Sequence, residues 1–108
     1  MDIQIKRGLL DILVLAAIKN EDSYGYLIIK ELKPYLEISE STLYPILKRL
    51  EASECLSVRS AEHNGRLRKY YKITKTGRKR LESFASEWEE MMQIYNYVMR
   101  GEKKNDEA

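Results

Sequence analysis

The chain has 108 residues, of which 33% are charged and 44% hydrophobic, and its formal net charge at pH 7 is +2. This length fits one domain with a modest core, and so small a net charge by itself favours no nucleic-acid partner. The single cysteine, Cys55, excludes an internal disulfide, and together with the single histidine, His63, it excludes the usual Cys/His zinc sites, so we expect neither a metal nor a cofactor.

The first predicted helix spans residues 6–19. Its residues from Leu9 to Ile18 leave almost no polar face, so the helix must be covered on more than one side, most simply by a second subunit. This apolar run is interrupted by Asp11 and is about ten residues long, whereas a membrane span needs ~20. No signal-peptide pattern precedes it, and we therefore expect a cytoplasmic protein.

A second helix is predicted over about residues 24–32, with apolar residues at helical spacing. Asp22 or Ser23 can cap its start, because either side chain can accept a free backbone N–H. Pro34 is expected to stop it by pushing Lys33 away from the α region.

A third helix is predicted to begin at the serines Ser39 and Ser41 and to end near Glu54. Its core face consists of four apolar residues at i, i+3, i+4 and i+7, which are Leu43, Ile46, Leu47 and Leu50. The opposite side carries Ser41, Pro45, Lys48 and Ala52, flanked by Tyr44 and Arg49. This small, hydroxylated and positive face suits the major groove of DNA.

The dipeptide Asn64-Gly65 predicts a β-hairpin with a two-residue type I′ turn, which needs positive φ at both positions. The turn fixes a cross-strand register. The apolar pairs Leu56 with Ile73 and Val58 with Tyr71 share one face, and the other face pairs Ser57 with Lys72, Arg59 with Tyr70, Ala61 with Arg68, and His63 with Arg66. That second face is therefore basic, with one aromatic ring.

Charge is concentrated in the middle of the chain. Residues 48–80 hold eleven Lys or Arg and three Asp or Glu, a net charge of +8. Residues 1–47 hold five basic and seven acidic residues, and residues 81–108 hold three basic and seven acidic residues. A segregated basic block creates a local field for polyanions, and the plain alternative is a solvated, Lys-rich surface.

The last helix is predicted from about Lys75 to Met99, with Thr74 as its cap. Apolar residues at alternating spacings of three and four form an a/d seam of Leu81, Phe84, Trp88, Met91, Tyr95 and Val98, widened by Ala85, Met92 and Met99. Such a seam is typical of a helix that pairs with another helix. Residues 101–108 are charged and without periodicity, which indicates a disordered tail.

The predicted fold class is mainly α with a two-stranded β-hairpin. Three helices followed by a hairpin with a basic face form the winged helix-turn-helix arrangement, in which the third helix enters the major groove and the wing lies along the backbone. A long C-terminal dimerisation helix follows. We expect a DNA-binding domain over residues 1–74, a dimerisation helix over 75–100 and a tail over 101–108.

Three segments carry a family resemblance. They read SYGYLIIKEL at residues 23–32, STLYPILKRLE at 41–51 and GRLRKYYKITKTGR at 65–78. In this order and at these separations they resemble the PadR family of bacterial transcriptional regulators, over roughly residues 8–100. The resemblance implies a homodimeric winged-helix repressor that binds an inverted repeat in double-stranded DNA and is often released by a small molecule. The single helix after the wing looks like the short subgroup of that family.

The sequence departs from the family pattern at three places. Glu54-Cys55 stands where a glycine commonly ends the third helix, so a non-glycine residue must adopt the left-handed conformation there. Leu27 replaces a frequent glutamate and Leu67 a frequent proline. None of these changes removes a DNA-facing charge.

The candidate DNA contacts lie on the third helix and on the wing. On the helix, the candidates for base edges and nearby phosphates are Ser41, Thr42, Tyr44, Lys48 and Arg49. On the wing, the candidates for gripping phosphates are Arg66, Arg68 and Lys72. Any single Lys or Arg is more often a solvated side chain, but several phosphate contacts add to one another.

Trp88 has two interpretations. It is either an aromatic residue of the dimer core or a wall of a pocket for a small hydrophobic or planar aromatic effector, as multidrug-sensing relatives use. Its neighbours at helical spacing are Leu81, Phe84, Met91, Met92 and Tyr95. A regulatory role is open for Cys55 as a redox sensor and for His63 as a pH switch, and a plain structural role is the simpler interpretation of both.

Two other classes of function compete. A winged-helix module used only for protein contacts would not need the basic block. An enzyme is disfavoured, because the sequence shows no nucleophile and base at recognisable spacing, no phosphate loop and no metal set. The operator sequence, the regulated genes and the effector are not readable from the residues.

Overall fold

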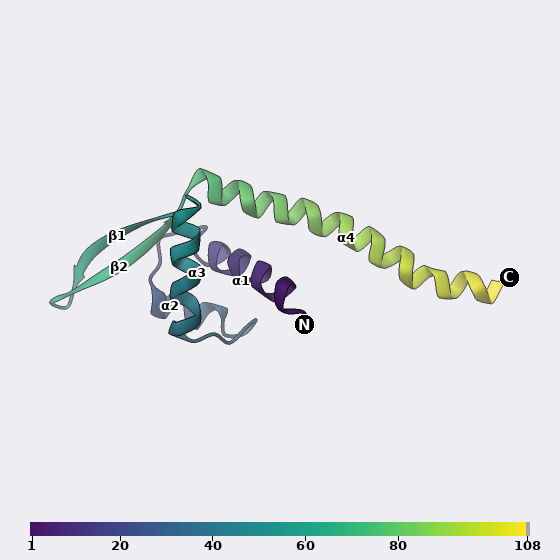
Figure 1. Ribbon diagram of the computed structural model, residues 1–108, viewed down its shortest axis with the longest axis horizontal. Coiled ribbons are helices and arrows are strands. Elements are labelled where there is room, and N and C mark those ends of the chain that lie inside the picture. Colours follow the sequence, from purple (N-terminus) through teal and green to yellow (C-terminus); the bar gives the residue numbers. More distant parts are fainter. Residues whose placement is uncertain (108) are drawn as a thin grey trace.

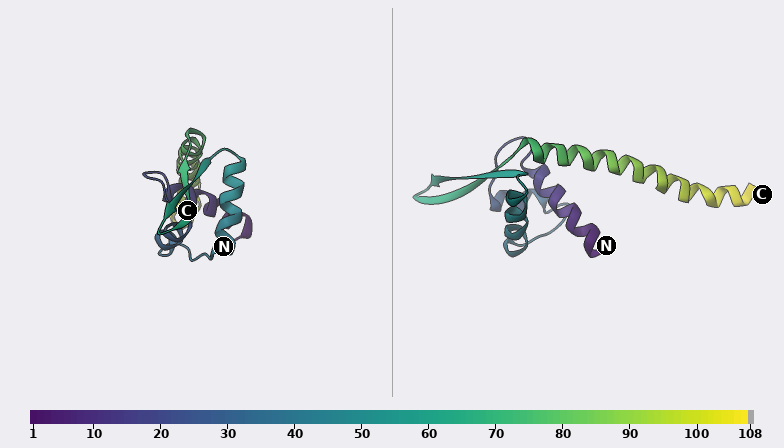
Figure 2. Two further views of the ribbon diagram at one scale, coloured as in Figure 1. Left: turned by 90° about the vertical axis from the view of Figure 1, so that its left-hand side faces the viewer. Right: turned by 45° about the horizontal axis from the view of Figure 1, so that its top comes forward.

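The structure is a computed structural model that describes the backbone of residues 1–107 and the side chains of residues 1–100. The elements follow in the order α1 (Ile3–Ala17), α2 (Gly25–Leu32), α3 (Glu40–Ala52), β1 (Leu56–His63), β2 (Arg66–Ile73) and α4 (Lys75–Glu107). Helices α1, α2 and α3 form a compact body, from which the hairpin extends on one side and α4 on the other (Figures 1 and 2). This confirms the predicted fold class, a winged helix-turn-helix with a long C-terminal helix.

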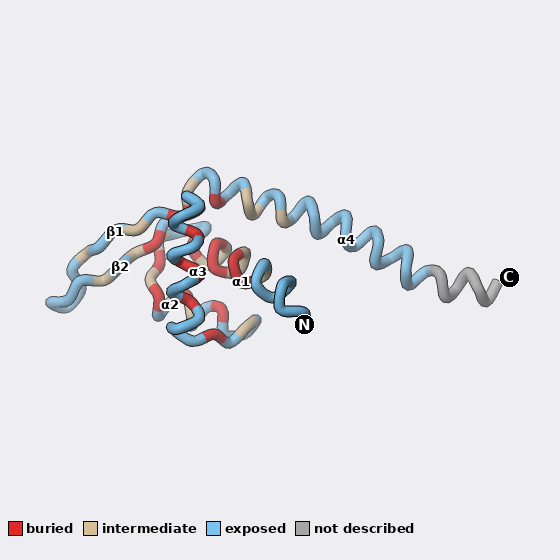
Figure 3. Tube along the Cα trace, viewed as in Figure 1, coloured by how far each residue is buried: buried red, intermediate tan, exposed pale blue. Residues whose placement is uncertain are grey.

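The core lies where the three helices of the body meet the base of the hairpin (Figure 3). The predicted core face of α3 is confirmed, because Leu43, Ile46, Leu47 and Leu50 are at most 4% exposed. Tyr71 is buried and Tyr70 is half-buried, as the alternation along β2 predicts. The distal half of the hairpin lies beyond this core.

Side-chain and backbone groups set the helix ends. Helix α1 begins earlier than predicted, because the Asp2 carboxylate accepts the N–H groups of Gln4 and Ile5. Helix α3 begins at Glu40, because the Ser39 hydroxyl accepts the N–H of Thr42. The prediction that a serine hydroxyl caps the start of α3 is confirmed for Ser39.

Helix α2 ends at Leu32 as predicted, but the predicted causes of its start and of its end are wrong. Its N-cap is Tyr24, which makes no side-chain cap bond. Ser23 instead exchanges two backbone hydrogen bonds with Tyr71, and the Asp22 carboxylate accepts from Arg59. Lys33 keeps helical angles (φ −51°, ψ −41°) before Pro34, because its N–H still donates to the carbonyl of Ile29. This hydrogen bond outweighs the preference of a residue before proline for an extended conformation.

The hairpin register is confirmed at every predicted pair, from Leu56 opposite Ile73 to His63 opposite Arg66. Asn64 and Gly65 have φ values of 51° and 78°, as a type I′ turn requires. Glu54 follows the end of α3 with a left-handed φ of 62°. This confirms the prediction that a non-glycine residue adopts the left-handed conformation there.

Thr74 joins the end of α3 to the start of α4. Its hydroxyl donates to the carbonyl of Glu54 at 2.6 Å and accepts the N–H of Gly77 at 3.1 Å, so the predicted cap is confirmed. Gly77 has no room for a side chain, because a Cβ there would lie 2.2 Å from the carbonyl oxygen of Cys55.

Asp11 is the buried centre of an ion cluster that joins three helices. Its carboxylate accepts hydrogen bonds from Arg49 on α3 and from Arg80 on α4, the latter at 2.9 Å. Burial opposes the charged form of Arg80, but bonds to Cys55 and Asp11 favour it, so the pKa of Arg80 is raised. The sequence presented Asp11 only as an interruption of an apolar helix.

Helix α4 leaves the body and gives the chain an elongated shape. The Cα radius of gyration is 18.0 Å and the longest dimension is 71 Å, whereas a compact chain of this length would have a radius of about 13 Å. The helix continues past the predicted end near Met99. The side chains of residues 101–108 lie outside the described part of the structure, and the disordered tail stays a prediction. Within the described residues, no helix combines the length and apolarity that a membrane crossing requires.

Candidate nucleic-acid interface

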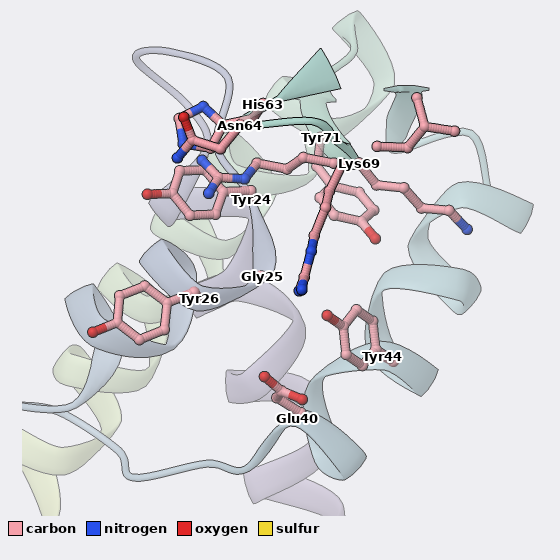
Figure 4. Close-up of a pocket in the computed structure, with 12 residues that line it drawn as sticks. Tyr24, Gly25, Tyr26, Glu40, Tyr44, His63, Asn64, Lys69 and Tyr71 are labelled. Carbon is pink, nitrogen blue, oxygen red and sulfur yellow. The ribbon is translucent and has the colours of Figure 1, made fainter. Parts of the chain in front are cut away.

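A groove of about 730 Å³ separates the wing from the N-terminal ends of α2 and α3. Figure 4 shows its arrangement, with Tyr44 and Glu40 from α3 on one side and His63, Asn64 and Lys69 from the hairpin on the other. The groove is open, and its lining mixes basic, aromatic and hydroxyl-bearing side chains with one carboxylate, that of Glu40. Such a lining fits an extended polyanion better than an enclosed small molecule.

The helix wall of the groove is built by a close approach of α2 to α3. A Cβ on Gly25 would lie 3.0 Å from the hydroxyl oxygen of Tyr44, so the glycine leaves room for that ring between the two helices. Tyr44 is exposed, and one turn further along α3 Lys48 is exposed on the same side. The free backbone N–H groups and the dipole at the start of a helix add partial positive charge to this wall.

The wing wall carries Arg66, Arg68 and Lys69. Sequence reasoning missed Lys69, because strand alternation places it on the same face as the buried Tyr71. That face is buried only near the base of the hairpin, so further out Lys69 faces α3 across a small hollow that it shares with Tyr44 and Lys48. The length of the strands, which exceeds what the core can cover, was the available signal.

The other face of the wing, which the sequence presented as an open basic surface, packs on the segment before α2. The guanidinium carbon of Arg68 lies 4.0 Å from the ring centroid of Tyr24, and that of Arg59 lies 4.6 Å from Tyr70. The two tyrosine rings meet edge to face at 5.8 Å. Arg59 also donates to Asp22, at 3.3 Å from both nitrogens. Each arginine therefore lies against a tyrosine ring, although the Arg59 side chain remains 56% exposed.

The groove brings together some of the predicted DNA contacts and not others. Tyr44, Arg66 and Arg68 line it, and Lys48 lies beside it. Thr42 and Arg49 lie instead along the hollow between α3 and α1, where Arg49 is bound to Asp11. Ser41 bonds the hydroxyl of the cap residue Ser39 at 2.8 Å. Lys72 is exposed near the base of the wing, on the same strand face as Arg66 and Arg68, and does not line the groove.

A second hollow, of about 380 Å³, lies between α1 and α4 and is mainly apolar. Its walls include Leu9 and Ile12 of α1 and Phe84, Trp88 and Met91 of α4. The rings of Phe84 and Trp88 lie 6.3 Å apart and nearly parallel. The predicted seam residues Met92 and Tyr95 are exposed further along α4, and Leu81 packs against the core.

The groove offers binding rather than covalent chemistry. Its positive groups are guanidinium and ammonium donors, which suit phosphate oxygens. Among the described residues, no group of three or more His, Cys, Asp or Glu is arranged to hold a metal ion.

Comparisons with known proteins agree on one family. The family model for the transcriptional regulator PadR-like family matches residues 14–83. The X-ray structure of a PadR-like transcription factor from Bacteroides fragilis is similar with a TM-score of 0.81 at 34% identity, over 88% of this chain and 94% of that one. An uncharacterized protein from Lysinibacillus sphaericus is 36% identical over 102 residues, 90% of this chain and 94% of that protein. The structure of Bacillus subtilis PadR in complex with operator DNA shares the fold, with a TM-score of 0.66 at 22% identity over 71% of this chain and 46% of that one.

Proposed function

Because this chain belongs to the transcriptional regulator PadR-like family, we propose that it binds operator DNA as a homodimer and represses transcription until a small hydrophobic or planar aromatic ligand releases it. The family groups transcriptional regulators, which favours regulation over an enzymatic role. The finer parts of the proposal are DNA binding, dimerisation, repression and release.

The observation that carries DNA binding is the meeting of the basic wing and the start of α3 at one groove. A helix that enters the major groove has a phosphate strand running beside it, and that strand would pass between α3 and the wing. Arg66, Arg68 and Lys69 are placed to neutralise its phosphates. The Bacillus subtilis protein, which has the same fold, was solved in complex with operator DNA, and this supports DNA as the ligand.

Base reading belongs to the exposed side of α3 in this proposal. Tyr44 and Lys48 lie on that side, and Ser41 lies one turn before them, so these three would reach base edges in the major groove. Arg49 is left out, because its guanidinium already bonds the buried Asp11. Thr42 lies toward α1, and Lys72 lies near the base of the wing outside the groove, so neither belongs to this proposed surface.

The partner in the dimer is a second copy of this chain. Trp88 is 48% exposed although it lies in the middle of an apolar seam, and α4 packs against the rest of its own chain mainly through its first turns. A helix with such a seam is stabilised by packing against another helix. The exposed Ile5 of α1 lines the hollow beside Trp88 and extends the same apolar surface. A twofold dimer would cover both elements and present two copies of α3 to an inverted repeat.

The hollow between α1 and α4 is the proposed effector site. Phe84 and Trp88 offer ring faces and Met91 offers an adaptable side chain, which suits flat hydrophobic ligands. Arg80, which lines the same hollow, bonds Asp11, and Asp11 in turn bonds Arg49 of α3. Occupation of the hollow would therefore act on the position of the DNA-reading helix. A panel of planar drugs that leaves Trp88 fluorescence unchanged would argue against this site.

Selection of bound fragments from genomic DNA with the purified protein tests the proposal. We expect an enriched palindrome, and transcription from a promoter that contains it should fall when the protein is added. The protein-contact alternative predicts no retained DNA at all. A matched control is a protein with Arg66 and Lys69 both changed to Gln, which should recover no enriched fragment although its core is unaltered.

A further inference from the structure

We propose that Tyr24 positions the wing for DNA binding, because its ring holds the Arg68 guanidinium ready to grip a phosphate. Tyr24 would not itself contact DNA in this role. The inference rests on the proposed DNA-binding function and adds to it a residue that neither the charge pattern nor the family match assigns.

The wing is joined to the segment before α2 by a continuous stack of side chains. The stack consists of Asp22, Arg59, Tyr70, Tyr24 and Arg68 in that spatial order. Beneath it, Ser23 and Tyr71 exchange two backbone hydrogen bonds of 3.1 and 2.8 Å. The backbone bonds fix the base of the wing, whereas the stack acts further out, on the side chains.

Stacking leaves Arg68 able to bind an anion. An aromatic ring contacts the face of a guanidinium, and its N–H groups point outward in the plane, where they can donate to a phosphate. Arg68 lines the groove together with Tyr24, so those donors lie at the proposed path of the strand. Arg59 differs, because its Nε and one Nη already donate to the Asp22 carboxylate, which also offsets its charge.

The stack orders the Arg68 side chain before DNA binds. A free arginine loses side-chain entropy when it grips a phosphate, and an arginine that is already held against a ring loses less. The ring changes neither the number of positive charges nor the number of phosphate contacts. Loss of Tyr24 should therefore weaken binding without changing its dependence on salt.

The test measures binding of the full chain to a short labelled duplex of mixed sequence by fluorescence anisotropy, at a series of salt concentrations. Phosphate contacts do not depend on sequence, so no operator is needed. We expect Tyr24→Leu to weaken binding roughly fivefold for each subunit that grips the duplex, with an unchanged salt slope. Tyr24→Phe, which keeps the ring face, should restore wild-type affinity. Tyr35→Leu is the matched control, because Tyr35 is exposed outside the groove lining.

The decisive comparison repeats Tyr24→Leu in an Arg68→Ala background. The proposal expects no further loss there, whereas a general packing role predicts the same loss in both backgrounds. Arg68→Lys gives a second measurement that keeps the charge and the fold, and wild-type affinity in that variant would overturn the proposal. If wild-type protein binds no duplex, the proposed function itself fails. If it binds and Tyr24→Leu binds equally well, only the role of Tyr24 is refuted.

Discussion

Replacing Asp11 with Asn should destabilise the protein far more than the same replacement at Asp22. Both carboxylates bind arginines, but they differ in burial. The Asp11 side chain is 7% exposed and serves two partners, whereas that of Asp22 is 29% exposed and serves one. The pair of variants therefore separates the effect of a buried ion cluster from that of a surface ion pair.

The magnitude follows from what the substitution leaves behind. The Asp11 carboxylate accepts charge-assisted hydrogen bonds from two guanidinium groups, and removing one such buried charge leaves its partners uncompensated. Arg49 and Arg80 are 44% and 39% exposed, so water recovers part of the loss. We expect a loss of about 2–3 kcal/mol for Asp11→Asn and at most about 1 kcal/mol for Asp22→Asn.

Thermal and urea unfolding, followed by circular dichroism at one fixed protein concentration, measure both losses. The fixed concentration matters because dimerisation adds to apparent stability. The expected difference of at least about 1 kcal/mol corresponds to a melting temperature that is lower for Asp11→Asn than for Asp22→Asn by roughly 5 °C or more. Equal melting temperatures for the two variants would refute the view that Asp11 holds α1, α3 and α4 together.

Three further predictions concern other parts of the chain. Gly77→Ala should cost about 2–3 kcal/mol in the same unfolding assay, because its Cβ would lie 2.2 Å from the Cys55 carbonyl oxygen, and an unchanged stability would contradict that packing. Trp88→Glu should yield a folded monomer in light scattering, and a persisting dimer would place the interface elsewhere. Burial first, and then the charges of Tyr44 and Glu51, raise the pKa of Tyr71 above its usual value of 10.0. The neutral form of Tyr71 therefore contributes its full stability below about pH 10, and this contribution declines as the pH rises further. Tyr71→Phe should therefore show a shallower alkaline loss of stability, and an identical pH profile would count against a buried Tyr71.

Local signals made much of the fold predictable from the sequence. The turn Asn64-Gly65 fixes the hairpin register, because side chains alternate strictly along a strand once the loop is known. The core face of α3 follows from helical spacing in the same way. The chain must turn after the third helix in a left-handed conformation, and because no glycine stands there, Glu54 adopts it.

Contacts between distant segments were not predictable in this way. Asp11 meets Arg49 and Arg80, which lie 38 and 69 residues away, and neither pairing has a local signature. The assignment of Arg49 to a DNA-facing surface depended on its direction on the helix alone. In the structure its guanidinium instead bonds the buried carboxylate of Asp11. Tyr24 and Arg68 meet only because the wing folds back over the start of α2.

The central claim is that α3 and the wing of a homodimer hold duplex DNA in the groove between them. The salt dependence of duplex affinity tests this claim most directly, because each neutralised phosphate contributes about −0.9 to the slope of log K against log salt concentration. With Arg66, Arg68 and Lys69 acting in both subunits, six contacts should give a slope of about −5. A slope no steeper than about −2, as one or two contacts would give, would contradict the claim.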